Sequence, residues 1–244
     1  MYLKNSKIVA VKIGSSLLID NNMKIRTKWL TEFSKDVKKL VDQGKKVIII
    51  TSGAIALGCK KLNLKKTNLK LDKSQAVASI GQIELMNLFK KNFNKVKLNL
   101  SQILLTLEDT EQRRRAINAK RTINNLFKLG FVPIVNENDT VSIDEIMFGD
   151  NDILASKVAS MVDAEFLILL TDIDGLYNGN PKKNKNAKLI SMISEKDFDS
   201  NILSDTDDNI SAGGMTSKIY AALNVSKFGM PTICLLYTSP SPRD

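Results

Sequence analysis

The chain has 244 residues, 43% of them hydrophobic, and is therefore long enough to bury the core of one large α/β domain. It has no histidine and only two cysteines, Cys59 and Cys234, which excludes histidine-based acid–base chemistry and leaves almost no material for zinc sites or disulfides. The sequence shows neither a signal peptide nor an apolar stretch of roughly 18 residues, and this predicts a cytoplasmic protein without a membrane partner.

The formal net charge of +10 comes mostly from lysines that are spread along the chain among many Asn and Ile residues. Lys, Asn and Ile share A/T-rich codons, which favours genomic base composition as the origin of the charge. Aromatic residues do not interleave with the lysines, as a groove for single-stranded nucleic acid would require. We predict no nucleic-acid partner, and a basic RNA-binding protein remains the alternative outside enzymes.

Apolar β-rich runs predict strands, and helical periodicity separates most of them. The predicted strands are 8–13, 47–50, 102–105, 132–135 and 166–170, and the predicted helices are 26–42, 73–90, 110–128, 152–162 and 215–228. Gly44 and Gly130 follow two of these helices as stop signals. The polar segment 178–188 is predicted to be an exposed loop. The alternation of strands and helices predicts an α/β fold with a mostly parallel sheet covered on both faces.

The first two strands end in small residues. The first runs into Lys12-Ile13-Gly14-Ser15-Ser16, and the second into the segment 51–58, which contains Ser52 and Gly53 and opens a helix. Backbone amides in such turns can face an anion, and ligands of open α/β sheets gather at the carboxyl ends of strands. A plain turn after the first strand and tight strand–helix packing after the second remain the alternatives.

The segments 136–140 and 148–152 bring many polar side chains around an apolar strand. Asp150 or Asn151 could cap the helix expected near Asp152. A cap uses only one such residue, so the density of polar groups favours a ligand site.

The strand 166–170 leads into Thr171-Asp172-Ile173-Asp174-Gly175, where hydroxyl and carboxylate groups suit a ribose or metal-linked site. A calcium loop is excluded because its remaining ligands and terminal glutamate are missing. The segment 212–218 places two glycines at the start of a helix with a lysine in its first turn, which is typical of phosphate binding. The chain contains neither GxxxxGK[ST] nor GxGxxG, so the two commonest nucleotide folds are excluded.

The end of the chain changes composition abruptly. Thr232 and Ile233 begin what is expected to be another strand, and the sequence then becomes LLYTSPSPRD. We hypothesise that residues from about Leu235 onward are not native, and a flexible natural tail is the alternative.

Together these segments resemble the amino acid kinase family over about residues 8–233. The strings at 132–141, 148–152 and 169–177 are similar, in order, to the motifs of its glutamate 5-kinase members. The resemblance implies a three-layer αβα sandwich with a mostly parallel central sheet. It implies one kinase domain over 1–234, with an N-terminal part that binds glutamate and a C-terminal part, from about 165, that binds ATP. Residues 235–244 would then be a non-native or disordered tail, without the PUA domain of many bacterial relatives.

The resemblance also implies roles for individual residues. Lys12 and Lys218 match the two lysines that contact phosphate. Asp152 matches the carboxylate that organises these lysines, and it is the third catalytic residue. The matched positions for glutamate are Ser52, Gly53, Asp139 and Asn151, and those for the nucleotide are Lys12, Thr171, Asp172, Ala212, Gly213, Gly214, Met215, Thr216, Ser217 and Lys218. One departure is Ser211-Ala212, where the family usually has Gly-Thr, which removes a hydroxyl near the nucleotide.

The activity implied by the resemblance is transfer of the γ-phosphoryl group of ATP to the side-chain carboxylate of L-glutamate, the first step of proline biosynthesis. Mg²⁺ would arrive as MgATP, with no metal ligands from the protein. The implied partners are a second copy in a dimer or tetramer, proline as feedback inhibitor and glutamyl phosphate reductase. Kinases acting on acetylglutamate, aspartate, carbamate or a nucleoside monophosphate are the alternatives. The segment 132–152 favours glutamate 5-kinase over them.

Overall fold

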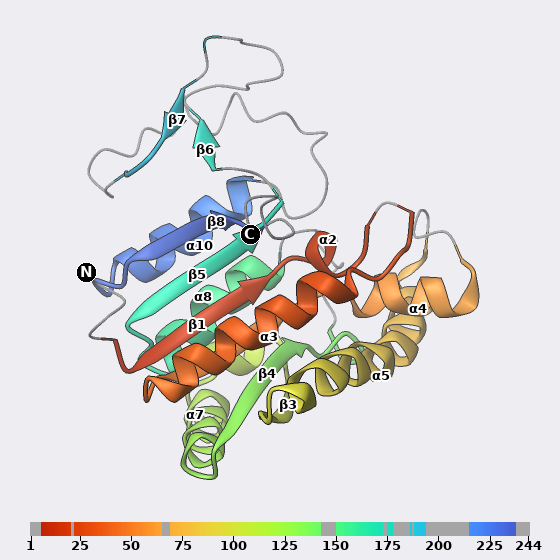
Figure 1. Ribbon diagram of the computed structural model, residues 1–244, viewed down its shortest axis with the longest axis horizontal. Helices are drawn as coiled ribbons and strands as arrows, with labels where there is room; N and C mark the ends of the chain where they lie inside the picture. The colour runs from red at the N-terminus through yellow and green to blue at the C-terminus, as the bar shows by residue number, and fades with distance from the viewer. Residues whose placement is uncertain are drawn as a thin grey trace.

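The computed structural model describes residues 6–20, 22–64, 69–142, 150–172, 175–177, 186, 188–193 and 215–237. Its main sheet has the strand order β3-β4-β2-β1-β5-β8, and every neighbouring pair is parallel. These strands are β1 (Ile8–Ile13), β2 (Lys46–Thr51), β3 (Asn99–Leu105), β4 (Phe131–Glu137), β5 (Phe166–Thr171) and β8 (Thr232–Leu236). A second, antiparallel pair consists of β6 (Leu176–Tyr177) and β7 (Leu189–Ile190), which projects beyond the sheet (Figure 1).

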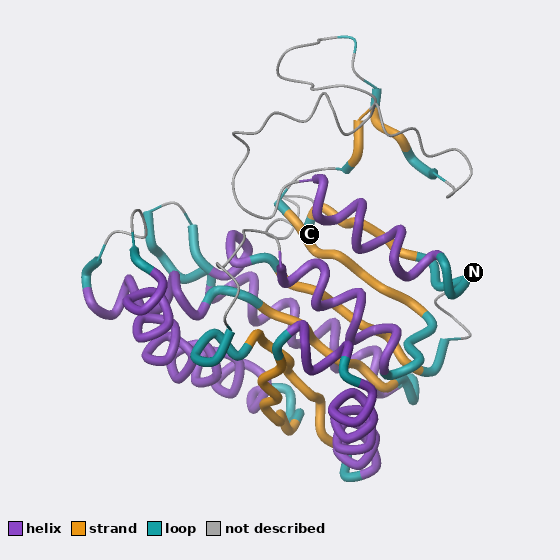
Figure 2. The backbone as a smooth tube through the Cα atoms, turned by 180° about the vertical axis from the view of Figure 1, so that it is seen from behind, coloured by secondary structure: helices purple, strands orange, loops and turns teal. Residues whose placement is uncertain are grey.

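Helices cover both faces of the main sheet, α3 in front of it in Figure 1 and α8 and α10 in front of it in the reverse view of Figure 2. One face carries α2 (Ser15–Leu18), α3 (Thr27–Asp42), α4 (Ala54–Leu62) and α5 (Leu71–Lys95). The other carries α6 (Leu107–Glu111), α7 (Arg113–Lys128), α8 (Asp150–Met161) and α10 (Met215–Ser226). The predicted three-layer arrangement around a mostly parallel sheet is confirmed.

The central strands are apolar on both sides because both sides are covered. Along β1, Val9, Val11 and Ile13 pack into the core on the α3 side, whereas Ala10 packs into the core beneath α8. Period-2 alternation assigns successive side chains to opposite faces, so a strand with two buried faces needs a continuous apolar run. Lys12 interrupts that run and is itself only 5% exposed.

The predicted elements are present, with shifted bounds. The region predicted as one helix over 110–128 contains two, because Gln112 adopts an extended conformation between α6 and α7. Thr106 and Asp109 form a capping box that starts α6, a signal that the helical period alone does not contain. Gly44 and Gly130 have positive φ angles of 80° and 77° after α3 and α7, which confirms them as helix stops. Most of the predicted loop 178–188 lies outside the described residues.

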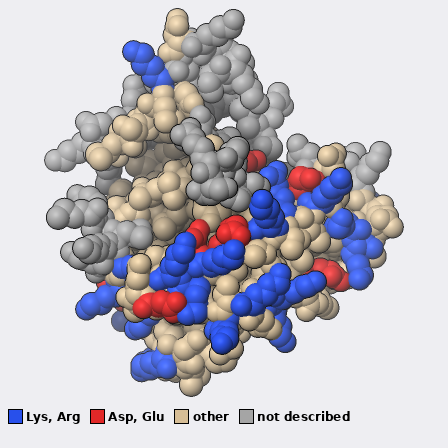
Figure 3. Space-filling model, viewed as in Figure 1, with Lys and Arg blue, Asp and Glu red and all other residues tan. Residues whose placement is uncertain are grey.

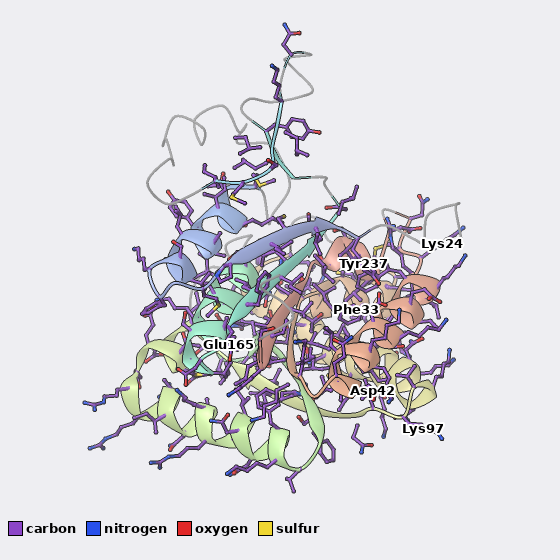
Figure 4. All side chains as sticks on the ribbon, turned by 60° about the vertical axis from the view of Figure 1, so that its left-hand side comes forward. Lys24, Phe33, Asp42, Lys97, Glu165 and Tyr237 are labelled. Atoms are coloured by element: carbon purple, nitrogen blue, oxygen red, sulfur yellow. The ribbon has the colours of Figure 1, made fainter. Side chains whose placement is uncertain are left out.

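The strand expected from Thr232 is confirmed and continues to Leu236. Tyr237 follows it and lies beside α3, on the side of Phe33 (Figure 4). The indole Nε1 of Trp29 donates to the carbonyl oxygen of Tyr237 at 2.7 Å, and the two rings meet edge to face at 5.5 Å. The hydroxyl of Tyr237 also donates to the carboxylate of Asp36. The non-native origin of the residues from about Leu235 onward stays a hypothesis.

Positive charge on the face shown in Figure 3 is interspersed with carboxylates. On α3, Lys35 pairs with Glu32 at 2.8 Å and Lys39 pairs with Asp36 at 3.0 Å. This mixture of charges agrees with the sequence, in which the lysines are spread along the chain. Within the described ranges, no helix is both long and apolar enough to cross a membrane.

Candidate active site

The parallel register brings the segments after four strands to one edge of the sheet. Ile13 at the end of β1 lies opposite Thr51 of β2 and Leu170 of β5. On the other side of β2, Ile50 lies opposite Val135 of β4. The polar residues that follow these strands are therefore neighbours in space although they are distant in the sequence, as expected for a ligand site of an open α/β sheet.

A buried ion cluster lies at this edge. Asp152 of α8 is fully buried, and its Oδ1 forms an ion pair with Nζ of Lys12 from β1. Its other oxygen, Oδ2, lies 3.3 Å from Nζ of Lys218 and accepts a hydrogen bond of 2.9 Å from Ser217 Oγ, both in the first turn of α10. The structure thus brings together the three residues predicted to be catalytic.

The electrostatics of the cluster follow from its burial. Burial by itself would raise the pKa of Asp152, but Lys12 and Lys218 outweigh it and lower that pKa below its usual range. Burial lowers the pKa of Lys12, and Asp152 opposes this shift. With both lysines protonated, two cations face one anion, so the cluster has an excess of positive charge that can attract a phosphoryl group.

The residues predicted to bind glutamate lie around the same edge. Ser52 Oγ donates to the carbonyl oxygen of Ile13 at 3.4 Å. Gly53 has a φ of 112° where α4 begins, a conformation that favours glycine. Asp139 follows β4, is half-buried, and burial raises the pKa of its carboxyl group to about 6. Asn151 Oδ1 is buried and has no hydrogen-bond partner among the described residues, so it can accept from a ligand.

On the predicted nucleotide side, Thr171 is buried at the end of β5, with Oγ1 at 3.5 Å from Oδ1 of the exposed Asp172. In α10, the side chains of Met215, Thr216 and Ser217 are partly exposed. The remaining predicted nucleotide residues, Ala212, Gly213 and Gly214, lie outside the described residues.

Three residues near the predicted site were not identified from the sequence. Cys234 of β8 interacts electrostatically with the ion cluster, and burial raises the pKa of its thiol, which therefore stays uncharged. From α5, Gln82 Oε1 accepts from Asn136 Nδ2 at 2.7 Å, and Gln75 Nε2 donates to the carbonyl oxygen of Ser142 at 2.9 Å. A glutamine in a helix of mixed polarity has no sequence signal that separates it from a surface residue.

A surface groove of about 910 Å³ lies elsewhere, lined by residues of α7, α8 and the turn after α10, including Ile117, Met161 and Phe228. None of the predicted site residues lines it. Two of its lysines already have acidic partners, since Lys120 pairs with Asp163 and Lys157 with Glu111. The ion cluster at the strand ends is therefore the better candidate for chemistry.

Comparisons with known proteins agree with this fold. The model of the amino acid kinase family matches residues 7–235. A protein named Glutamate 5-kinase from Pelagibacter ubique (strain HTCC1062) is 66% identical over 91% of this chain and 61% of its own length. A Glutamate 5-kinase from Bradyrhizobium diazoefficiens is 43% identical over 90% of this chain and 60% of its own. The chain thus spans about three fifths of the length of these curated relatives.

Solved structures share the fold at low sequence identity. Carbamate kinase from Giardia lamblia, bound to AMP-PNP, superposes with a TM-score of 0.68 at 14% identity, covering 97% of this chain and 95% of that one. UMP kinase from Bacillus anthracis gives 0.62 at 14% identity, covering 97% and 89%. Because the family model matches nearly the whole chain and the buried lysines and aspartate lie at the shared strand ends, this chain belongs to the amino acid kinase family.

Proposed function

We propose that this chain carries the activity of an ATP-dependent glutamate 5-kinase. It would transfer the γ-phosphoryl group of ATP to the side-chain carboxylate of L-glutamate, giving L-glutamyl 5-phosphate at the first step of proline biosynthesis. Similarity to proteins named Glutamate 5-kinase, at up to 66% identity, supports the choice of substrate. The observation that carries the proposal is the buried cluster of Lys12, Asp152 and Lys218.

The reaction needs charge neutralisation more than proton transfer. A glutamate side chain with a pKa of about 4.3 is already an anion at neutral pH and needs no base to act as a nucleophile. A chain without histidine can therefore perform this chemistry. The difficulty is to bring one anion up to another, so the protein must supply positive charge where the phosphoryl group is transferred.

The ion cluster is suited to this task. Lys12 and Lys218 come from different elements and would contact the phosphoryl group from two sides, while Asp152 holds both at a fixed separation. Fixed charges in a site with little water need no rearrangement during the reaction, which increases their effect on the transition state. Ser217 accounts for a further hydrogen bond to the Asp152 carboxylate.

Mg²⁺ fits the site as a part of MgATP. The described residues contain no group of three Asp, Glu, Cys or His side chains able to hold a metal ion. Asp152, the buried carboxylate nearest the chemistry, is already engaged by two lysines. When bound, the ion would neutralise charge on the ATP phosphates.

The remaining assignments complete the proposal. Ser52, Gly53, Asp139 and Asn151 would bind the amino acid, and Thr171, Asp172 and the segment 212–218 would bind ATP. A homo-oligomer, proline as feedback inhibitor, glutamyl phosphate reductase as recipient of the product and a cytoplasmic location also stay predictions, with no membrane or nucleic-acid partner.

The test of the proposed function is hydroxamate formation. The chain would be incubated with ATP, Mg²⁺, hydroxylamine and L-glutamate, with aspartate and acetylglutamate as comparison substrates. An acyl phosphate reacts with hydroxylamine, so glutamate-selective hydroxamate is the expected result. A folded chain that gives no product, or that prefers a comparison substrate, would refute the assignment.

Loss of either lysine is expected to remove turnover. Lys12→Ala and Lys218→Ala each delete a positive charge at the transferred phosphoryl group, and the turnover number should fall by at least about 10²–10³-fold. Lys157→Ala is the matched control, because Lys157 lies in α8 but pairs with Glu111 away from the cluster. Steady-state ADP release measures all three variants, and full activity in Lys12→Ala or Lys218→Ala would refute the role of that lysine.

Glutamate binding is expected to depend on pH through Asp139. Its carboxyl group has a pKa of about 6, so it loses its negative charge as the pH falls through 6 and can no longer attract the ammonium group of the substrate. The KM for glutamate should rise about tenfold between pH 7 and pH 5. Asp139→Asn should have a high KM for glutamate at every pH. If its KM rose between pH 7 and pH 5 as much as that of the unmodified chain, the prediction would be contradicted.

A further inference from the structure

Two glutamines of α5 contact the segment that carries Asp139. Gln75 and Gln82 are separated by two helical turns and therefore lie on the same side of α5. Gln82 Oε1 accepts a hydrogen bond of 2.7 Å from the side chain of Asn136, and Gln75 Nε2 donates one of 2.9 Å to the backbone of Ser142. Asp139 lies between these two contacts in the chain, so α5 holds both ends of the segment 136–142.

The hydrogen bond between Gln82 and Asn136 is partly buried and uses only the nitrogen of the Asn136 amide. Asn136 is 2% exposed, and its Oδ1 is buried without a hydrogen-bond partner among the described residues. The hydrogen bond to Gln82 uses the amide nitrogen of Asn136 and so determines where this oxygen points. An amide held by only one of its two polar groups is a means of presenting the other to a ligand.

The position of Gln82 is itself tightly constrained. The preceding residue, Gly81, packs so closely against α4 that a Cβ atom there would lie 1.8 Å from the carbonyl oxygen of Ala54. Ala54 is the first residue of α4 and directly follows Ser52 and Gly53. At this turn α5 therefore packs through Gly81 against the start of α4, after β2, and bonds through Gln82 to Asn136 at the end of β4. Predicted glutamate-binding residues follow both strands.

The end of the segment 136–142 has its own buried contact. Ser142 Oγ donates to Glu137 Oε1 at 3.0 Å, and both residues are buried. The hydrogen bond from Gln75 to the Ser142 backbone ties this closed segment to α5. Both glutamines therefore stabilise the conformation of the segment 136–142, and neither belongs to the ion cluster.

We infer that Gln82, assisted by Gln75, is a positioning residue that sets the conformation of the segment 136–142 for binding of the amino acid substrate. This inference rests on the proposed function. Gln82 acts through Asn136, so it affects affinity for the amino acid and leaves affinity for ATP, which depends on other segments, unchanged.

The test uses Gln82→Met, which retains the length of the side chain and removes both hydrogen-bonding groups. Its KM for L-glutamate should rise about five- to tenfold, the effect of one hydrogen bond of ordinary net strength. The KM for ATP should stay within about twofold and the turnover number within about threefold. Asn87→Met is the matched control, since Asn87 is exposed on the same helix, and its KM values should not change.

Gln75→Met is a second variant that keeps the inference testable if Gln82→Met does not fold. It should also raise the KM for glutamate and leave the KM for ATP unchanged. Normal KM values in the folded variants, beside an active unmodified chain, would overturn this inference alone. An equal rise in KM for glutamate and ATP would also overturn it, because a general loss of structure acts on both substrates. No glutamate-dependent turnover in the unmodified chain would overturn the proposed function and this inference together.

Discussion

Asp152→Asn is expected to abolish turnover and to destabilise the protein by about 3–5 kcal/mol. The substitution keeps the size of the side chain but leaves Lys12 and Lys218 buried together without an anion between them. Two buried cations repel each other, and each has lost the interaction that offset its desolvation. Loss of their fixed separation would also misplace the charges that stabilise the transferred phosphoryl group.

Urea unfolding measures the free energy, and ADP release measures turnover. The control is Asp163→Asn, which removes the exposed partner of Lys120 just after the end of α8. Exposed ion pairs contribute about 0–1 kcal/mol, so this variant should be nearly as stable and active as the unmodified chain. Asn is also readily accepted at the positive φ of residue 163, 53°. Equal stability losses in the two variants would contradict the interpretation of Asp152 as the organiser of a buried cluster.

Gly81→Ala is expected to destabilise the fold by at least about 3 kcal/mol, since overpacking of this severity exceeds what a core absorbs. The new Cβ atom would lie 1.8 Å from the carbonyl oxygen of Ala54 and 2.7 Å from its carbonyl carbon, so α4 and α5 would have to separate. On the facing helix, a Cβ at Gly58 would lie 2.0 Å from the carbonyl oxygen of Val77. The two glycines therefore permit direct backbone contact between these helices.

Separation of α4 from α5 should also raise the KM for glutamate, because α4 begins immediately after Ser52 and Gly53. Asn87→Ala is the control for helix propensity. It lies exposed in α5, and alanine there should be neutral or slightly stabilising, as helix propensities predict. Urea unfolding of both variants checks the expectation, and a Gly81→Ala protein as stable as the unmodified chain would show that the helices can move apart at little cost.

The secondary structure was predictable where one local signal dominated. Continuous apolar runs identified the central strands because those strands are buried on both faces. Helix ends at Gly44 and Gly130 followed from the need for a positive φ. The division between α6 and α7 was not predicted, because a capping box at Thr106 and an extended Gln112 override an otherwise continuous helical period.

The location of the candidate site was predictable in part. Strand ends with glycine, hydroxyl and carboxylate residues indicated it, since parallel strands deliver their carboxyl ends to one edge. The pairing of Asp152 with two lysines was expected from the family resemblance, and the structure brings these side chains into contact. The raised pKa of Asp139 could not be predicted, because it depends on burial by residues distant in the chain.

The sequence by itself determined the order of the elements, the parallel sheet and the residue types available for chemistry, because these depend on local periodicity and composition. Only the tertiary structure decided which of these residues meet. The ion pairs of Asp152 join β1, α8 and α10, and the hydrogen bond of Gln82 joins α5 to the segment after β4. Such contacts depend on the packing of helices against the sheet, which brings together side chains that no spacing along the chain relates.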